Sequence, residues 1–203
     1  MTAKIYDIFP TPIVKDAFPR KFTESEISFF SRIEKEVYPN YSNKTSENTF
    51  ILDEPEMKDI KNICEKIINE YYKKVYQPTP DSHLYITQSW LNYTETGKEH
   101  HTHTHTNSFI SAVLYIEANK DEDVISFFKS GHQPYEIPIT SANDYNVNRL
   151  YFKVDKYDII IFPSEVVHGV PATTNPNTRI SLAFNSFIKG TIGNKQNLNY
   201  LEL

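Results

Sequence analysis

The chain has 203 residues, of which 39% are hydrophobic and 14% aromatic, and its net charge is -5. This size and apolar content predict one folded domain and exclude a disordered chain. The acidic balance, without a polybasic run, argues against binding to nucleic acid. The single cysteine, Cys64, excludes an internal disulfide. No apolar run is long enough for a signal peptide or a membrane span, so we expect a cytoplasmic protein without a membrane partner.

The first third of the chain predicts two helices. Residues 1–20 contain three prolines among apolar side chains, which favours an extended segment. Thr23 and Glu26 form a capping-box pattern that begins an amphipathic helix, and we expect this helix to end before Pro39. A second helix is predicted over residues 57–75, where apolar side chains recur every three or four residues.

After Pro80 the apolar pattern changes to that of strands. Six strands are predicted, at residues 84–93, 109–116, 124–128, 150–154, 159–162 and 179–188. Helices followed by strands indicate an α+β fold, mainly β, in which antiparallel strands form a sandwich or barrel and the N-terminal helices pack on one sheet. We predict a single domain over residues 1–203. Its helical part spans about 20–77, its β core about 83–188, and a loosely held C-terminal extension residues 189–203.

Four of the seven histidines fall within residues 100–105. On an extended chain, His101, His103 and His105 share one face and His100 takes the other. Neutral imidazole is the commonest metal-binding side chain, so this face predicts a metal site. The alternative is a solvated strand end that is rich in histidine.

A second segment adds to this cluster. His168 follows a predicted buried strand and a proline turn, and Arg179 and Ser181 begin the last strand eleven residues later. Arg179 can form a bidentate pair with a carboxylate, and Ser181 on the same face can add a hydroxyl donor. Taken singly, His168 would be a packed side chain and Arg179 a surface salt bridge.

Together, in this order, these motifs resemble the Fe(II)- and 2-oxoglutarate-dependent oxygenases, and within them the 2-oxoglutarate-Fe(II) oxygenases of bacteria and their phages. The resembling segments are residues 8–13 (Ile-Phe-Pro-Thr-Pro-Ile), 89–92 (Ser-Trp-Leu-Asn), 103–108 (His-Thr-His-Thr-Asn-Ser), 110–116 (Ile-Ser-Ala-Val-Leu-Tyr-Ile), 162–164 (Phe-Pro-Ser) and 179–185 (Arg-Ile-Ser-Leu-Ala-Phe-Asn). The resemblance covers residues 8–188. It implies a double-stranded β-helix, which is a jelly-roll or cupin-like fold.

The resemblance also implies an iron site. His103 matches the first iron ligand and His168 the distal histidine. His105 stands where the superfamily usually has a carboxylate, so the implied site has three histidines instead of two histidines and one acid. The pair His101 and His103 is an alternative register for the first two ligands.

The cosubstrate site is implied in the same way. Arg179 matches the residue that binds the far carboxylate of 2-oxoglutarate, Ser181 the hydroxyl beside it, and Tyr115 a tyrosine that reaches the same carboxylate or belongs to the core. Asn92 and Asn107 are candidates for the pocket lining, with a strand edge and a turn as their respective alternatives.

The implied activity is hydroxylation that uses Fe(II), 2-oxoglutarate and O2, with ascorbate as a supporting reductant, and releases succinate and CO2. The implied substrate is a prolyl or other amino-acid residue of a protein or peptide, or a small molecule. Two alternatives are a cupin-type metalloenzyme that does not use 2-oxoglutarate and a non-catalytic metal-binding structural protein. The sequence leaves the oligomeric state open.

Overall fold

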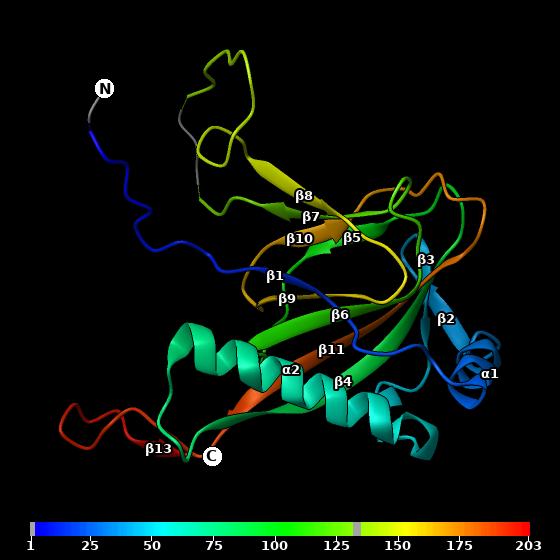
Figure 1. Ribbon diagram of the computed structural model, residues 1–203, viewed down its shortest axis with the longest axis horizontal. Helices are drawn as coiled ribbons and strands as arrows, with labels where there is room; N and C mark the ends of the chain where they lie inside the picture. Colours follow the sequence, from blue (N-terminus) through cyan, green and yellow to red (C-terminus); the bar gives the residue numbers. More distant parts are fainter. Residues whose placement is uncertain (1–2, 132–134) are drawn as a thin grey trace.

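Two antiparallel sheets form the body of the computed structural model, which describes residues 3–131 and 135–203 (Figure 1). The larger sheet contains, in spatial order, β1 (Val14–Ala17), β9 (Asp158–Pro163), β6 (Ile110–Glu117), β11 (Arg179–Lys189), β4 (His83–Thr94), β3 (Asn43–Ser46) and β2 (Val37–Asn40). The smaller sheet contains β5 (His100–His103), β10 (His168–Val170), β7 (Val124–Phe128) and β8 (Arg149–Lys153).

The chain crosses repeatedly between these two sheets. After β4 it enters the smaller sheet as β5 and returns as β6. It then forms β7 and β8 in the smaller sheet, β9 in the larger, β10 in the smaller and β11 in the larger. The inner faces meet in an apolar cluster that includes Tyr115 and Phe162 from the larger sheet and Ile125 and Phe127 from the smaller one. This is the predicted double-stranded β-helix, in a fold that is mainly β.

The six predicted strands are all present, as β4, β6, β7, β8, β9 and β11, and their ends differ from the predicted ends by one residue or less. The polar stretch at residues 40–48 was not predicted to be a strand, but it forms most of the β2–β3 hairpin at the sheet edge. The C-terminal extension is not loosely held throughout. Its β12 (Thr191–Ile192) pairs with β13 (Leu201–Glu202), and Gly190 and Leu203 exchange two backbone hydrogen bonds of 3.1 Å.

The first helix, α1 (Glu24–Ile33), begins at the predicted capping box. The Glu26 amide donates to the Thr23 hydroxyl at 3.2 Å, and the Thr23 amide donates to the Glu26 carboxylate at 2.7 Å. The helix is shorter than predicted, because the chain turns into β2 from Val37. Pro39 is tolerated there because β2 is an edge strand, where a missing amide proton costs little pairing.

The second helix, α2 (Lys58–Tyr76), lies across the outer face of the larger sheet (Figure 1). Two short 3-10 turns, η1 (Ile51–Asp53) and η2 (Pro55–Met57), precede it. Its buried face includes Ile60, Cys64 and Ile68, which belong to the main hydrophobic core together with residues of α1, β4, β6 and β11. Both helices therefore pack on one sheet, as predicted.

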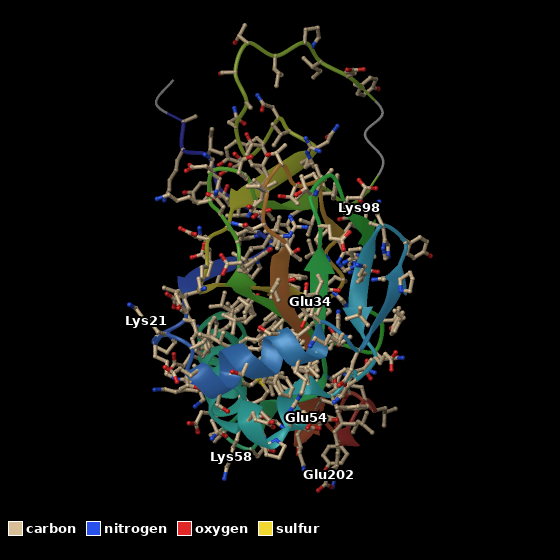
Figure 2. All side chains as sticks on the ribbon, turned by 90° about the vertical axis from the view of Figure 1, so that its right-hand side faces the viewer. Lys21, Glu34, Glu54, Lys58, Lys98 and Glu202 are labelled. Atoms are coloured by element: carbon tan, nitrogen blue, oxygen red, sulfur yellow. The ribbon has the colours of Figure 1, made fainter. Side chains whose placement is uncertain are left out.

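Charged side chains lie mostly outside this core. Figure 2 shows Lys21, Lys58 and Glu202 at the periphery of the molecule, and all three are exposed. None of the described helices is both long and apolar enough to cross a membrane.

Candidate metal centre

The inner face of the larger sheet carries rows of polar side chains, because alternate residues of a strand face the same side. On β11, Arg179 pairs with Thr94 of β4, and Ser181 pairs with Asn92 of β4 and Tyr115 of β6. These five residues line one pocket between the sheets. The predicted cosubstrate residues are thus brought together by strand register.

The opposite wall of the pocket is formed by histidines. β5 and β10 place His103 directly opposite His168. His105 lies in the loop after β5, where its amide donates to the Ser164 carbonyl at 3.0 Å. The Nε2 atoms of His105 and His168 are 3.2 Å apart, and one ring nitrogen from each of His103, His105 and His168 lies within 4.8 Å of the others. These are the three predicted metal ligands.

Backbone carbonyls orient two of these rings. His103 Nδ1 lies 2.8 Å from the His101 carbonyl, and His168 Nδ1 lies 2.9 Å from the Val166 carbonyl. A carbonyl only accepts, so each Nδ1 carries the proton and each Nε2 keeps its lone pair. This is the arrangement of a metal-binding histidine whose second nitrogen is held by the protein.

The histidines are neutral at physiological pH. Burial, together with the neighbouring imidazoles, lowers the pKa of His105 to about 3 and that of His168 to about 4. Burial also lowers the pKa of His103. Neutral imidazole is the form that binds metal ions, so burial favours binding over protonation.

The alternation predicted for residues 100–105 is wrong at His100 and His101. The pairing of β5 with β10 is irregular. His103 lies opposite His168 and His100 opposite Val170, so a step of three residues along β5 matches a step of two along β10. This irregularity turns His100 toward the pocket, where its ring stacks on His103 at 4.8 Å. His101 is not part of the pocket lining and packs against Tyr41 instead.

The alternative ligand pair, His101 and His103, belongs to a second group of histidines that could hold a metal ion. His100, His101 and His103 also bring one nitrogen each within 4.8 Å of the others. His103 belongs to both groups, but only His103, His105 and His168 all line the pocket that contains Arg179. The geometry therefore favours the group that includes His168.

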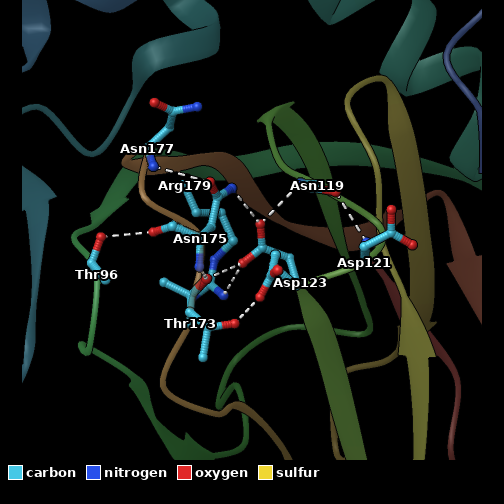
Figure 3. A network of polar contacts seen from close by, with 10 residues as sticks. Thr96, Asn119, Asp121, Asp123, Thr173, Asn175, Asn177 and Arg179 are labelled. Atoms are coloured by element: carbon cyan, nitrogen blue, oxygen red, sulfur yellow. Dashed lines mark hydrogen bonds and ion pairs between the residues drawn. The ribbon is translucent and has the colours of Figure 1, made fainter.

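Arg179 is not a surface residue. Its side chain is 3% exposed, and Nη1 donates to Oδ1 of Asp123 at 3.0 Å (Figure 3). Asp123 itself is fully buried. Asp123 was not predicted as a site residue, because it ends the polar stretch Asn-Lys-Asp-Glu-Asp at residues 119–123, which is typical of a solvated turn.

Tyr115 and the two asparagines differ in their surroundings. The Tyr115 hydroxyl is buried and has no hydrogen-bond partner among the described residues. Asn92 Oδ1 accepts a hydrogen bond from Thr45 at 3.0 Å, which fixes its amide at the pocket wall. Asn107 lies in a turn with φ of 55° and is not part of the lining.

Comparisons with known proteins concern the family and the fold of the chain. Residues 88–185 match the family model described as "Putative 2OG-Fe(II) oxygenase". No curated protein sequence matches the chain.

Solved structures share the fold at low sequence identity. A Pseudomonas putida prolyl-4-hydroxylase is similar with a TM-score of 0.57 and 13% identity, over 86% of this chain and 92% of that one. HygX from Streptomyces hygroscopicus, with nickel and 2-oxoglutarate bound, gives 0.58 and 14%, over 87% and 82%. A Trichoplax adhaerens prolyl hydroxylase in complex with a peptide gives 0.59 and 9%, over 86% and 83%. Residues 88–185 therefore form a 2OG-Fe(II) oxygenase domain, and the chain shares its fold with solved enzymes of this class.

Proposed function

We propose that this oxygenase holds Fe(II) through His103, His105 and His168 and binds 2-oxoglutarate through Arg179, assisted by the residues around it. The observation that carries the proposal is that both sets of side chains line one pocket between the two sheets. A metal ligand set and a buried arginine at the two ends of one pocket suit a ligand with a chelating head and a distant carboxylate.

The residues fit the iron. His103 and His168 present Nε2 lone pairs, and backbone carbonyls hold their rings in place. Imidazole suits Fe(II), although the usual facial site replaces one histidine with a carboxylate. Three neutral histidines leave the ion one charge more positive than that site does, which strengthens its attraction for an anionic ligand.

The residues also fit the far carboxylate. The buried Tyr115 hydroxyl lacks a partner in the described structure, and such a group is costly unless a ligand satisfies it. Arg179 donates a hydrogen bond from Nη1 to Asp123, and its other nitrogens show no hydrogen bond to a described residue. Ser181 lies beside Tyr115 in the same row. An incoming carboxylate would therefore meet several free donors.

When bound, Fe(II) supplies the oxidative decarboxylation of 2-oxoglutarate to succinate and CO2 that drives hydroxylation of a substrate C–H bond with O2. The protein's own part is to hold and orient. Arg179 would fix the far end of the cosubstrate, and the three histidines would hold the iron that binds its head. Val113, Ile125 and Ala183 line the pocket between these ends and limit the access of water.

We propose a prolyl or other amino-acid residue of a protein or peptide as the substrate, with a free small molecule as the second candidate. The support is the likeness in fold to a bacterial prolyl-4-hydroxylase and to a prolyl hydroxylase solved with a peptide. Ascorbate is included as a reductant that supports turnover.

The test is turnover of 2-oxoglutarate by untagged protein reconstituted with Fe(II) in the presence of O2 and ascorbate. We expect succinate by mass spectrometry, and a mass increase of one oxygen atom in proline-containing peptides that are substrates. His168→Ala should form no succinate, whereas His83→Ala, which changes an exposed histidine far from the pocket lining, should match the unsubstituted protein. Absence of both succinate and calorimetric 2-oxoglutarate binding would contradict the proposal.

A further inference from the structure

Asp123 stands where three connections of the fold meet around Arg179 (Figure 3). It ends the β6–β7 connection, and its partners Thr173 and Asn175 lie in the β10–β11 connection. That connection is joined in turn to the β4–β5 connection, since Thr96 donates to the Asn175 carbonyl at 2.7 Å. All three connections lie at the Arg179 end of the pocket.

Four donors converge on the Asp123 carboxylate. Oδ1 accepts from the Thr173 hydroxyl at 2.6 Å and from Arg179 Nη1 at 3.0 Å. Oδ2 accepts from the side-chain amide of Asn175 and from the backbone amide of Asn119, each at 3.0 Å. An ionised carboxylate is the side chain that can accept at both oxygens, whereas an asparagine would turn an NH2 group toward two of these donors.

The charge of Asp123 is maintained despite its burial. Burial by itself would raise the pKa of this carboxyl group, but the hydrogen bonds from Thr173, Asn119 and Asn175 and the positive Arg179 hold the pKa below its ordinary value. Asp123 is therefore ionised at neutral pH and forms a buried pair with Arg179. Breaking such a pair leaves an uncompensated buried charge.

The pair is also asymmetric. Asp123 engages only Nη1, so it fixes one corner of the planar guanidinium and leaves the rest facing the pocket lined by Tyr115 and Ser181. A guanidinium held at one corner presents its remaining donors in a fixed direction. Rigid placement of a binding group improves affinity because less freedom is lost when the ligand arrives.

We propose that Asp123 is a positioning residue for cosubstrate binding, which acts on the far carboxylate of 2-oxoglutarate only through Arg179. The inference rests on the proposed function of Arg179. It predicts an effect that depends on the far carboxylate of the ligand, which a general structural role of Asp123 would not produce.

The experiment is calorimetric titration of the metal-loaded protein, in the absence of O2, with 2-oxoglutarate and with pyruvate, which has the 2-oxo acid head but no far carboxylate. We expect Asp123→Asn to weaken 2-oxoglutarate binding on the order of tenfold and to leave pyruvate binding within about twofold. The matched control is Asp121→Asn, which removes the same charge from an exposed position in the same connection and should change neither affinity.

A double-mutant cycle identifies the route of the effect. In the Arg179→Gln background, Asp123→Asn should cause no further loss of 2-oxoglutarate affinity. If Asp123→Asn does not fold, Thr173→Val provides the same test. It removes one hydrogen bond to Oδ1, keeps the charge, and should weaken 2-oxoglutarate binding about threefold without affecting pyruvate.

The proposal is overturned if Asp123→Asn weakens both acids equally, leaves 2-oxoglutarate unaffected, or tightens its binding, since tighter binding would mean that Asp123 competes with the cosubstrate for Arg179. An undiminished effect in the Arg179→Gln background would overturn it as well. If the unsubstituted protein binds pyruvate and 2-oxoglutarate equally, the proposed role of Arg179 fails first, and the inference fails with it.

Discussion

The two faces of the larger sheet differ sharply although the same strands build both. On β11, Leu182 and Phe184 face outward into the core beneath the helices, while Ser181 and Ala183 face the pocket. β4 repeats the division, with Leu91 and Tyr93 outward and Asn92 inward. Period-two alternation thus separates the residues that stabilise the fold from those proposed to do its chemistry.

The difference teaches what each face tolerates. The outer face is stabilised by apolar burial, which is large and non-directional. The inner face carries groups that are costly to bury: the Tyr115 hydroxyl, which has no partner among the described residues, and Arg179, which is paired with the buried Asp123. The histidines of the smaller sheet face them across the pocket. We therefore expect substitutions on the outer face to lower stability without changing ligand affinity. Substitutions on the inner face should instead weaken ligand binding.

The largest expected effect is on the outer face. Phe184 is 1% exposed, and Phe184→Ala should lower the free energy of unfolding by about 4 kcal/mol, because it leaves a cavity under the helices. Denaturant unfolding measures the loss. The fraction that remains folded should bind 2-oxoglutarate with unchanged affinity, and a selective loss of binding would break the division between the faces.

The second effect is on the pocket wall that the smaller sheet forms opposite the inner face. His168→Ala removes one of the three proposed metal ligands and should weaken Fe(II) or Mn(II) binding by at least about 100-fold, since even the groups that orient ligands are worth about 10 to 100-fold. Anaerobic metal titration measures it. His101→Ala is the informative partner variant: a comparable loss there would favour the group formed by His100, His101 and His103.

Two buried tyrosines sharpen the comparison further. The Tyr93 hydroxyl on the outer face donates to the Phe30 carbonyl at 2.6 Å, whereas the Tyr115 hydroxyl on the inner face has no partner in the described chain. Tyr115→Phe should raise the stability of the ligand-free protein by about 1 kcal/mol and weaken 2-oxoglutarate binding about tenfold. Tyr93→Phe should lower stability by about 1 kcal/mol and leave binding unchanged. Thermal unfolding measures the stability of both variants, and calorimetry measures their affinity for 2-oxoglutarate. Equal changes in the two variants would contradict the predicted difference between the faces.

The smallest effect concerns Glu26, an acid that is buried in the helical layer. Burial alone would raise the pKa of Glu26, but hydrogen bonds from Arg20 and Thr23 hold it below its ordinary value. Its contribution is therefore present above the unfolded-state pKa near 4.5 and is lost as the pH falls through the lower folded-state pKa. Glu26→Gln should cost about 1 kcal/mol at pH 7, and the difference from the unsubstituted protein should shrink below about pH 4.5. A constant difference across this range would exclude the ionic contribution.

Local periodicity explains which parts of the fold could be predicted. The second helix and six strands were predicted almost to the residue, because their apolar patterns report which side is buried. β5 and β10 were not predicted as strands, since three or four residues are too few to show a period. The β2–β3 hairpin was missed because its sequence is polar and contains Pro39, and only its place at the sheet edge makes it a strand.

Part of the candidate site was predicted from the sequence and part was missed. His103, His105 and His168 come together as expected, and Arg179, Ser181 and Asn92 share their pocket. His100 was misplaced, since nothing in the sequence marks the irregular pairing of β5 with β10. Asp123 was missed because its partner Arg179 lies 56 residues away, so the pair exists only through the folded chain. The family match over residues 88–185 favours an oxygenase over the cupin-type and non-catalytic alternatives.

The most direct test of the central claim is a crystal structure of the protein with Fe(II) and 2-oxoglutarate, prepared without O2, in which anomalous scattering locates the metal. We expect one metal ion about 2.1 Å from a ring nitrogen of each of His103, His105 and His168, with the far carboxylate on Arg179 and the Tyr115 hydroxyl. A metal ion held by His100, His101 and His103, or a 2-oxoglutarate whose far carboxylate lies away from Arg179, would contradict the account.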